Sequence, residues 1–370
     1  MKHIMATKKD TMGRMRPIKS DDGTWRRRAV SVHSKILRTQ PARIIVAPSY
    51  SHRTITRMLH DDGKTDRPDT SPAAQPVVAA IFCALFMLAP AKPPARAATA
   101  ETHSRIDTIA AQAERSPMLS VTEGFFFMGT TRTGHESFSL TQQYDDTEQP
   151  QRRIWLAPYE IDRDEVSLSE FLRWLALQHH PVPVELRTVI EHVMTMHALP
   201  SDTLARWPAL YVTWTEASDF CQAQGKRLPT EAEWEKAARG ERGNLFPWGP
   251  QPPTPALAMF GQSHVHEIPI VASVRSGNEG RSPYGLHHMA GNAAEWVADW
   301  FGIDYYMTMP ERDPRGPKNG RYKVIRGGSW KSLPALLRSA TRSGAPPDQR
   351  AATIGFRCAR SVAPSTIPTP

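Results

Sequence analysis

The stretch at residues 225–235, GKRLPTEAEWE, carries the strongest local signal in this 370-residue chain. Thr230 and Glu233 are spaced as the two partners of a capping box, in which each side chain accepts a hydrogen bond from the other residue's backbone amide. The spacing predicts a helix that begins after Thr230 and runs through Ala238. Gly240 follows, and glycine is the usual residue just past a helix C-terminus.

Outward from this helix, apolar periodicity and polar N-cap residues predict three more helices. They cover residues 167–177, 184–197 and 214–224, with Ser167 as the N-cap of the first and Thr213 or Thr215 as the N-cap of the last. Apolar or alternating runs predict strands at residues 121–129, 154–161, 324–325 and 354–359. Nine of the ten tryptophans lie beyond residue 100, and residues 244–291 are rich in Gly, Pro and Ser. We therefore expect a compact fold held by aromatic packing around long ordered loops, rather than by a large sheet or bundle.

The charge is divided unevenly along the chain. Residues 1–100 hold 18 Lys and Arg against 7 Asp, a balance of +11, whereas the remaining 270 residues hold 28 against 30, a balance of −2. The formal charge of +9 therefore belongs to the N-terminal part. The nearly neutral body gives no support for nucleic-acid binding.

The N-terminal part contains an apolar run of 13 residues at 77–89. A membrane-spanning helix needs roughly 20 such residues, whereas the core of a secretory signal is shorter. Small residues at 95–97 and 98–100 have the A-x-A form, which places cleavage near Ala97 or Ala100. Three alternatives remain: translation from Met58, an uncleaved anchor with a basic cytoplasmic tail, or a buried core segment. A cleaved signal, a start at Met58 and an uncleaved anchor all predict export to the periplasm or beyond. Contact with a membrane would come only through this leader.

The predicted organisation follows from these features. It comprises a disordered or untranslated leader at 1–57, a signal peptide or anchor at 58–100, a linker at 101–116, one domain at 117–363 and a disordered tail at 364–370.

A set of motifs in a fixed order accompanies GKRLPTEAEWE. They are Phe127-Met128-Gly129, Glu148-Gln149-Pro150, Tyr159-Glu160-Ile161-Asp162 with Glu165-Val166, Pro247-Trp248-Gly249, residues 285–296 (GLHHMAGNAAEW), residues 326–330 (RGGSW) and residues 355–358 (GFRC). The chain from about residue 117 to 363 thereby resembles the formylglycine-generating enzyme, or sulfatase-modifying factor, family. The resemblance implies a loop-rich α+β fold of the C-type-lectin-like kind. That family includes copper-dependent formylglycine generators, non-haem-iron relatives, a pyoverdine-maturation branch and binding or accessory members.

Copper binding is the first test of what the resemblance implies. Formylglycine generators hold Cu(I) with two cysteine thiolates, which lie three and eight residues after the Ser of the RGGS motif. Ser332 and Leu337 occupy the matching positions here. Because Cu(I) is a soft ion that requires thiolates, we expect no copper and no formylglycine formation.

The sequence also contains candidate sites for other metals. The string His264-Val265-His266-Glu267 is a local candidate for an iron or zinc site, the alternative being a solvated loop. His287 and His288 are adjacent, so that they would point apart on a strand. The resemblance also implies a calcium site at the backbone of Gly291 and Ala293 and the carboxylate of Glu295. His288 replaces its expected side-chain ligand, and a second calcium site near 258–274 is expected to be lost. The alternative for Glu295 is a buried structural carboxylate bonded to loop amides.

Two further expectations come with the resemblance. Cys221 and Cys358 match positions that form a disulfide in exported members, the alternative being two buried thiols. Arg326, Ser329, Arg338 and Arg342 match the substrate groove, where Arg side chains can hold a carboxylate or carbonyl group. The alternative for these arginines is internal pairing with Glu231, Glu233 and other acids.

Two functions remain open at this point. The first is an exported binding or accessory module that recognises a peptide, a glycan or an envelope protein. The second is an oxidoreductase of the same superfamily that uses a cysteine-independent site.

Overall fold

The structure, a computed structural model, describes residues 95–131, 146–262 and 269–362. Contacts divide the chain after Met87, and all described residues belong to the second unit. The apolar run at 77–89 and the His264–Glu267 string lie outside the described residues, as do the leader at 1–57 and the tail at 364–370. Within the described ranges, no helix combines the length and the apolar character needed to cross a bilayer.

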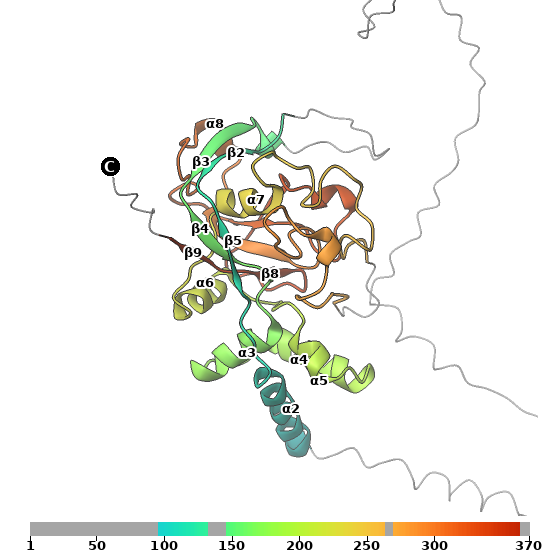
Figure 1. Cartoon of the computed structure of the whole chain (residues 1–370). Helices are drawn as coiled ribbons and strands as arrows, with labels where there is room; N and C mark the ends of the chain where they lie inside the picture. The colour runs from blue at the N-terminus through green and yellow to red at the C-terminus, as the bar shows by residue number, and fades with distance from the viewer. Residues whose placement is uncertain (1–94, 132–145, 263–268, 363–370) are drawn as a thin grey trace, which may run out of the picture. The chain divides into compact units, whose positions relative to one another are not determined.

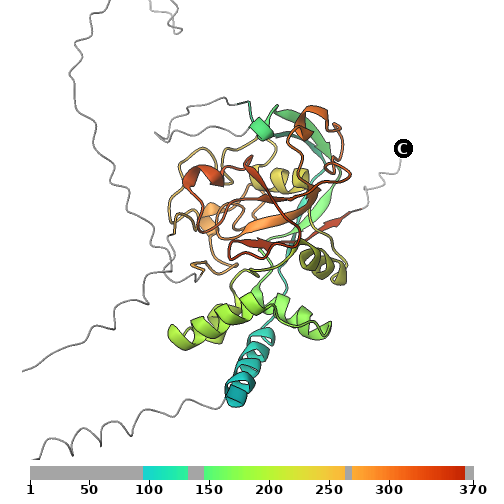
Figure 2. The same ribbon diagram turned by 180° about the vertical axis from the view of Figure 1, so that it is seen from behind.

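The helices confirm the capping predictions. Each of the three capped helices has a complete capping box, with Ser167 and Glu170, Thr213 and Glu216, or Thr230 and Glu233 as partners. The helices are α2 (Ala95–Ala110), α3 (Leu168–Leu177), α4 (Val184–Met196), α5 (Ser201–Ala205), α6 (Trp214–Ala223), α7 (Glu231–Arg239) and α8 (Tyr305–Thr308). Gly240 ends α7 with φ of 70°. The helices α2 to α5 lie at one end of the body and α8 at the other (Figure 1), and the view from behind shows the same arrangement (Figure 2).

The strands form three small sheets. Their orders are β1-β4-β9, β2-β3 and β7-β6-β5-β8, and among the strand pairs of the described residues only β5–β8 is parallel. The strands are β1 (Met118–Val121), β2 (Gly124–Met128), β3 (Arg152–Leu156), β4 (Tyr159–Asp162), β5 (Ala294–Trp300), β6 (Lys323–Arg326), β7 (Arg342–Ala345), β8 (Ile354–Phe356) and β9 (Ala359–Ser361). The mixed, loop-rich α+β class predicted from the sequence is confirmed.

Three predicted strands were wrong in their extent. The single strand expected at 154–161 is two strands in different sheets, separated by Ala157 and Pro158. Proline has no amide hydrogen, so it cannot continue a strand ladder as a donor. The runs at 121–129 and 354–359 are likewise each divided between two sheets. Apolar alternation continued across these breaks, which is why the sequence did not reveal them.

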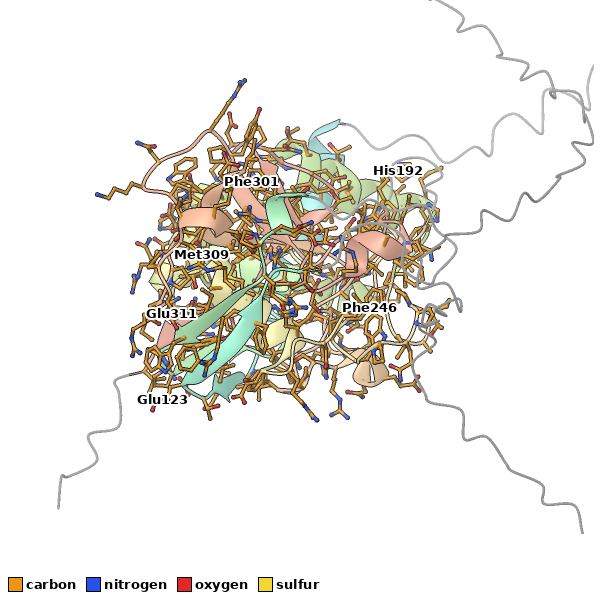
Figure 3. The ribbon with its side chains drawn as sticks, turned by 90° about the horizontal axis from the view of Figure 1, so that it is seen from above. Glu123, His192, Phe246, Phe301, Met309 and Glu311 are labelled. Atoms are coloured by element: carbon orange, nitrogen blue, oxygen red, sulfur yellow. A yellow bond between two sulfur atoms is a disulfide. The ribbon has the colours of Figure 1, made fainter. Side chains whose placement is uncertain are left out.

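The core is built around three tryptophans that are fully buried: Trp234 of α7, Trp296 of β5 and Trp330. Two large apolar clusters fill the body, and a small third cluster contains Phe246, Ala258, Ala290 and Leu337. Seen from above, Phe246 lies on the opposite side of the body from Met309 of the second large cluster (Figure 3). Between residues 244 and 291, the described part contains no regular element except a 3-10 turn at Asn278–Gly280, as the composition predicted.

Candidate functional site

The site region begins where β6 ends. Arg326 is the last residue of β6, and Gly327 and Gly328 follow with φ of 90° and 68°. The chain then turns tightly: Ser332 N donates to Ser329 O (2.9 Å), and Ser329 N donates to Ser332 Oγ (2.9 Å). Two consecutive residues in the left-handed region explain why glycines occupy both positions.

Ser332 and Leu337 are brought together beside Gly328. A Cβ at Gly328 would lie 3.2 Å from Ser332 Oγ and 3.0 Å from Leu337 Cδ2. Leu337 is fully buried, and Ser332 is half-buried. A hydroxyl and an isobutyl group do not fit Cu(I), which requires soft sulfur ligands. These two side chains therefore do not form a copper site.

The three arginines of the expected groove are buried in internal ion pairs. Arg342 makes a two-pronged contact with Glu231 (2.7 and 2.8 Å), and Arg338 makes one with Glu148 (2.6 and 2.8 Å). Arg326 pairs with Glu235. This is the internal-pairing alternative named above.

The partners differ in part from those expected. Glu233 pairs with Arg227 instead, at 2.7 Å through both oxygens. Burial raises the pKa of Glu231, but the Arg342 and Arg326 cations outweigh it, so the pKa of Glu231 is lowered. The three groove arginines therefore stabilise the interior of the site through ion pairs. Ser329, the fourth residue of the expected groove, is also buried, with 5 % of its surface exposed.

Glu295 is held in the centre of the four-stranded sheet. It faces Arg326 on β6 and Gly355 on β8 in the strand register. Its two carboxylate oxygens each accept a hydrogen bond from Arg357, at 2.7 Å, and Oε2 also accepts from Trp234 Nε1 at 2.8 Å. A cation already neutralises this carboxylate, so the arrangement at Gly291, Ala293 and Glu295 does not fit Ca²⁺. The partners are side chains, not the loop amides named as the alternative.

A second buried carboxylate, Glu165, was missed by the sequence reasoning. Its oxygens accept from Asn292 Nδ2 (2.6 Å) and from the Ala293 amide (2.9 Å). Burial, together with the nearby charge of Glu295, raises the pKa of Glu165 to about 8. Glu165 thus fixes the Gly291–Ala293 turn, and Asn292 adopts φ of 61° there. The only signal in the sequence for this contact was that Glu165 and Asn292 each belong to one of the quoted motifs.

The two adjacent histidines serve different partners. His287 Nδ1 lies 2.9 Å from Asp164 Oδ1, whereas His288 Nε2 lies 3.0 Å from the Ser273 carbonyl oxygen. Burial lowers the pKa of His288 to about 4. Within the described ranges, no group of three or more His, Cys, Asp or Glu side chains is arranged to hold a metal ion.

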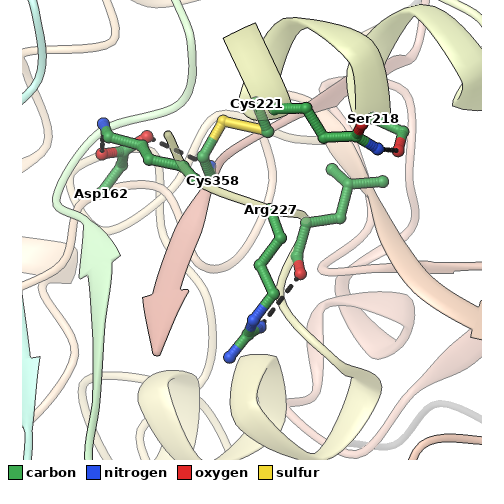
Figure 4. The surroundings of a disulfide bond; sticks show 8 residues. Asp162, Ser218, Cys221, Arg227 and Cys358 are labelled. Carbon is green, nitrogen blue, oxygen red and sulfur yellow. Dashed lines mark hydrogen bonds and ion pairs between the residues drawn. A yellow bond between two sulfur atoms is a disulfide. The ribbon is translucent and has the colours of Figure 1, made fainter. Parts of the chain in front are cut away.

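The expected disulfide is present. Cys221 of α6 and Cys358, just after β8, are bonded, and they are 137 residues apart in the chain. The Cys358 amide donates to Asp162 Oδ2 at 3.1 Å, which ties the bond to β4 (Figure 4). The two cysteines of the body are therefore not available as metal-binding thiolates.

Comparisons with known proteins identify the relatives of this chain. The family model described as sulfatase-modifying factor enzyme 1-like domain matches residues 105–362. The formylglycine-generating enzyme of Bos taurus is 31% identical over 297 residues, covering 67% of this chain and 76% of that protein. That of Thermomonospora curvata is 32% identical, covering 62% and 90%. The serine/threonine-protein kinase pkn1 of Chlamydia caviae is 34% identical, but the match covers only 35% of that protein.

Two solved structures are similar to this chain over about two thirds of its length. PvdO from Pseudomonas aeruginosa is 22% identical with a TM-score of 0.48, covering 66% of this chain and 94% of that one. Treponema denticola variable protein 1 is 22% identical with a TM-score of 0.47, covering 66% and 95%. The family model spans most of the chain and the bovine relative is matched over three quarters of its length. The chain therefore belongs to the sulfatase-modifying factor family.

Proposed function

We propose that this chain is an exported sulfatase-modifying-factor-type domain that binds a partner and does not generate formylglycine. The observation that carries the proposal is the pair Ser332 and Leu337, which meet beside Gly328 where the resemblance expects two thiolates. Cys221 and Cys358 are the only cysteines beyond residue 100, and they are joined to each other. The body thus offers no thiolate pair for Cu(I).

The kind of partner is suggested by the surface beside this pair. Leu333 is 62 % exposed and Leu336 is 47 % exposed, and both belong to the loop that carries Ser332 and Leu337. Two exposed leucines on one loop suit the side chains of a polypeptide better than the hydroxyl groups of a glycan. Among the partners considered, a peptide segment of an envelope protein fits best.

Export is supported by the disulfide, because such bonds persist in oxidising compartments. The apolar run at 77–89 would direct export, either as a cleaved signal or as an anchor. A near-neutral body remains consistent with a protein partner and gives no reason to propose nucleic acid.

Selection from a displayed peptide library tests the proposal. The full chain is immobilised beside its L333D/L336D variant and an M196D control, because Met196 is 69 % exposed on α4, away from this loop. The wild type and the control are expected to enrich the same peptides, and L333D/L336D is expected to lose them. Equal enrichment on all three proteins, or none, would contradict binding at this loop. Metal-dependent oxygen uptake would favour the oxidoreductase alternative instead.

A further inference from the structure

A cavity of about 160 Å³ lies away from the Ser332 loop, between α3, α6 and the segment that follows α2. Its apolar wall includes Trp174 and Phe220, whose rings meet edge to face with centroids 5.8 Å apart. Its polar wall includes side chains of both charges from residues 115, 162, 170, 173 and 226. The cavity is thus amphipathic, with aromatic rings on one side and charged groups on the other.

The two carboxylates of the wall are already engaged. Asp162 Oδ1 accepts from Lys226 Nζ at 2.5 Å, and Asp162 Oδ2 accepts from the Cys358 amide. Glu170 accepts from the Ser167 amide and hydroxyl in the capping box of α3. Lys226 therefore neutralises Asp162, whereas Glu170 is held by neutral donors and leaves one negative charge in the wall.

The two guanidinium groups of the wall are not engaged. Arg115 and Arg173 are exposed, and neither has a hydrogen bond or ion pair with any residue of the described ranges. A guanidinium group presents several N–H donors in a plane that matches a carboxylate. The two guanidinium groups outnumber the one unpaired carboxylate, Glu170, so the wall keeps a net positive charge that suits a carboxylate.

Further hydrogen-bonding capacity is unused in the same wall. Trp174 Nε1 and Gln224 Oε1 are buried and lack a partner among the described residues. Buried polar atoms usually have a partner, so an unpaired donor and an unpaired acceptor around one cavity point to a missing ligand or water. The residue Trp174 is 4 % exposed, so the surrounding packing holds its ring in place.

We propose that this cavity binds a small monocarboxylate with a compact apolar group, such as a single ring. Arg115 and Arg173 would hold the carboxylate, and the ring would lie against Trp174 and Phe220. The volume agrees with the size of the ligand, because an apolar cavity of about 150 Å³ accommodates benzene. The cavity shares no wall residue with the Ser332 loop, so this inference does not depend on the function proposed for that loop.

Benzoate and benzamide test the proposal, because they have the same shape and differ in charge. Binding to the full chain is measured by ligand-observed NMR and calorimetry. The R115A/R173A variant removes the two guanidinium groups, and R315A/R321A serves as a matched control at exposed arginines outside the cavity. All four arginines are exposed, so none of these changes disturbs the core.

The wild type and R315A/R321A are expected to bind benzoate alike and benzamide far more weakly. R115A/R173A is expected to bind benzoate about tenfold more weakly, since it loses two charge-assisted contacts. Equal binding of benzoate and benzamide, or equal binding of benzoate by R115A/R173A and the wild type, would overturn the proposal, as would no binding of benzoate at all.

A second pair of ligands identifies the source of the carboxylate. A peptide that ends in phenylalanine is offered with a free or an amidated C-terminus, in competition with benzoate. Competition by the free form alone supports the proposal with a polypeptide terminus as the source. Competition by neither form supports it with a free organic acid as the source. Displacement of benzoate by the amidated form as well would contradict recognition through a carboxylate.

Discussion

Ser332 Oγ and Leu337 Cδ2 face the same point beside Gly328, 3.2 and 3.0 Å from where a Cβ would stand. The two residues are five positions apart in sequence, and the 3-10 turn at Pro334–Leu337 folds them together. The scaffold therefore places these two positions beside the same glycine, although neither side chain has sulfur. We propose that this chain differs from its copper-dependent relatives in the side chains at these two positions and not in the backbone that places them.

Restoring thiols at the two positions should therefore restore copper binding. The S332C/L337C variant is expected to take up one Cu(I) per chain in competition with a chelator, because both sulfurs would face one point. The single variants S332C and L337C, and the control S332A/L337A, are expected to bind no stoichiometric copper. A folded S332C/L337C protein that binds none would show that the two positions do not form the family's thiolate pair.

The ion pair between Glu295 and Arg357 should dominate the stability of the central sheet. Both side chains are fully buried, so removing one partner leaves the other without a counter-charge. E295Q and R357M are each expected to lower the free energy of unfolding in urea by about 3–5 kcal/mol. The double variant E295Q/R357M should lose less than the sum of the two. Strict additivity would contradict a direct energetic coupling of this pair.

Asp299 should make stability fall as pH rises. Its Oδ2 accepts from the Glu231 amide at 2.8 Å, and burial and the Glu231 charge raise its pKa to about 8. Because the folded protein holds this proton more tightly than the unfolded chain, stability is lost between pH about 4 and about 8, by up to about 1.4 kcal/mol per pH unit.

The D299N variant tests this dependence, since asparagine does not titrate. Urea unfolding at several pH values should show that the stability of wild type relative to D299N declines steadily from pH 5 to 8. A constant difference would show that Asp299 is charged in the folded protein throughout this range.

The disulfide should contribute strongly to stability, because it joins residues 137 positions apart. In the chain-entropy account, closing so long a loop lowers the entropy of the unfolded chain and stabilises the folded protein by about 3–5 kcal/mol. Reductant is expected to lower the urea midpoint of the wild type and to leave that of C221A/C358A unchanged. An unchanged wild-type midpoint, with the cysteines shown to be reduced, would contradict this contribution.

Local signals in the sequence were sufficient for α3, α4, α6 and α7, but not for α2, α5 and α8. The capping boxes at Ser167, Thr213 and Thr230 depend on residues three positions apart, and all three are present. The strands β5 and β7 were not predicted, because their pairing joins β6 to segments distant in the chain. The break between β3 and β4 was missed although Pro158 lies in it, because apolar alternation continues on both sides.

The candidate site was predictable in its positions and not in its contacts. Motif order identified Arg326, Arg338 and Arg342, and Glu231, the partner of Arg342, was among the acids named as alternatives. Glu235 and Glu148, the partners of Arg326 and Arg338, come from segments 91 and 190 residues away. The pairings of Arg326 and Arg338 became known only when the fold placed the partners together. The same holds for Glu165, whose contact with Asn292 spans 127 residues.

The most direct test of the central claim is to offer the purified full chain Cu(I), oxygen and a sulfatase peptide that contains the target cysteine. Mass spectrometry then measures both bound copper and the conversion of the thiol to an aldehyde. We predict less than stoichiometric copper and no aldehyde, because a hydroxyl and an isobutyl group stand at positions 332 and 337. One copper per chain, or an aldehyde-bearing peptide that forms only when the protein is present, would contradict the account.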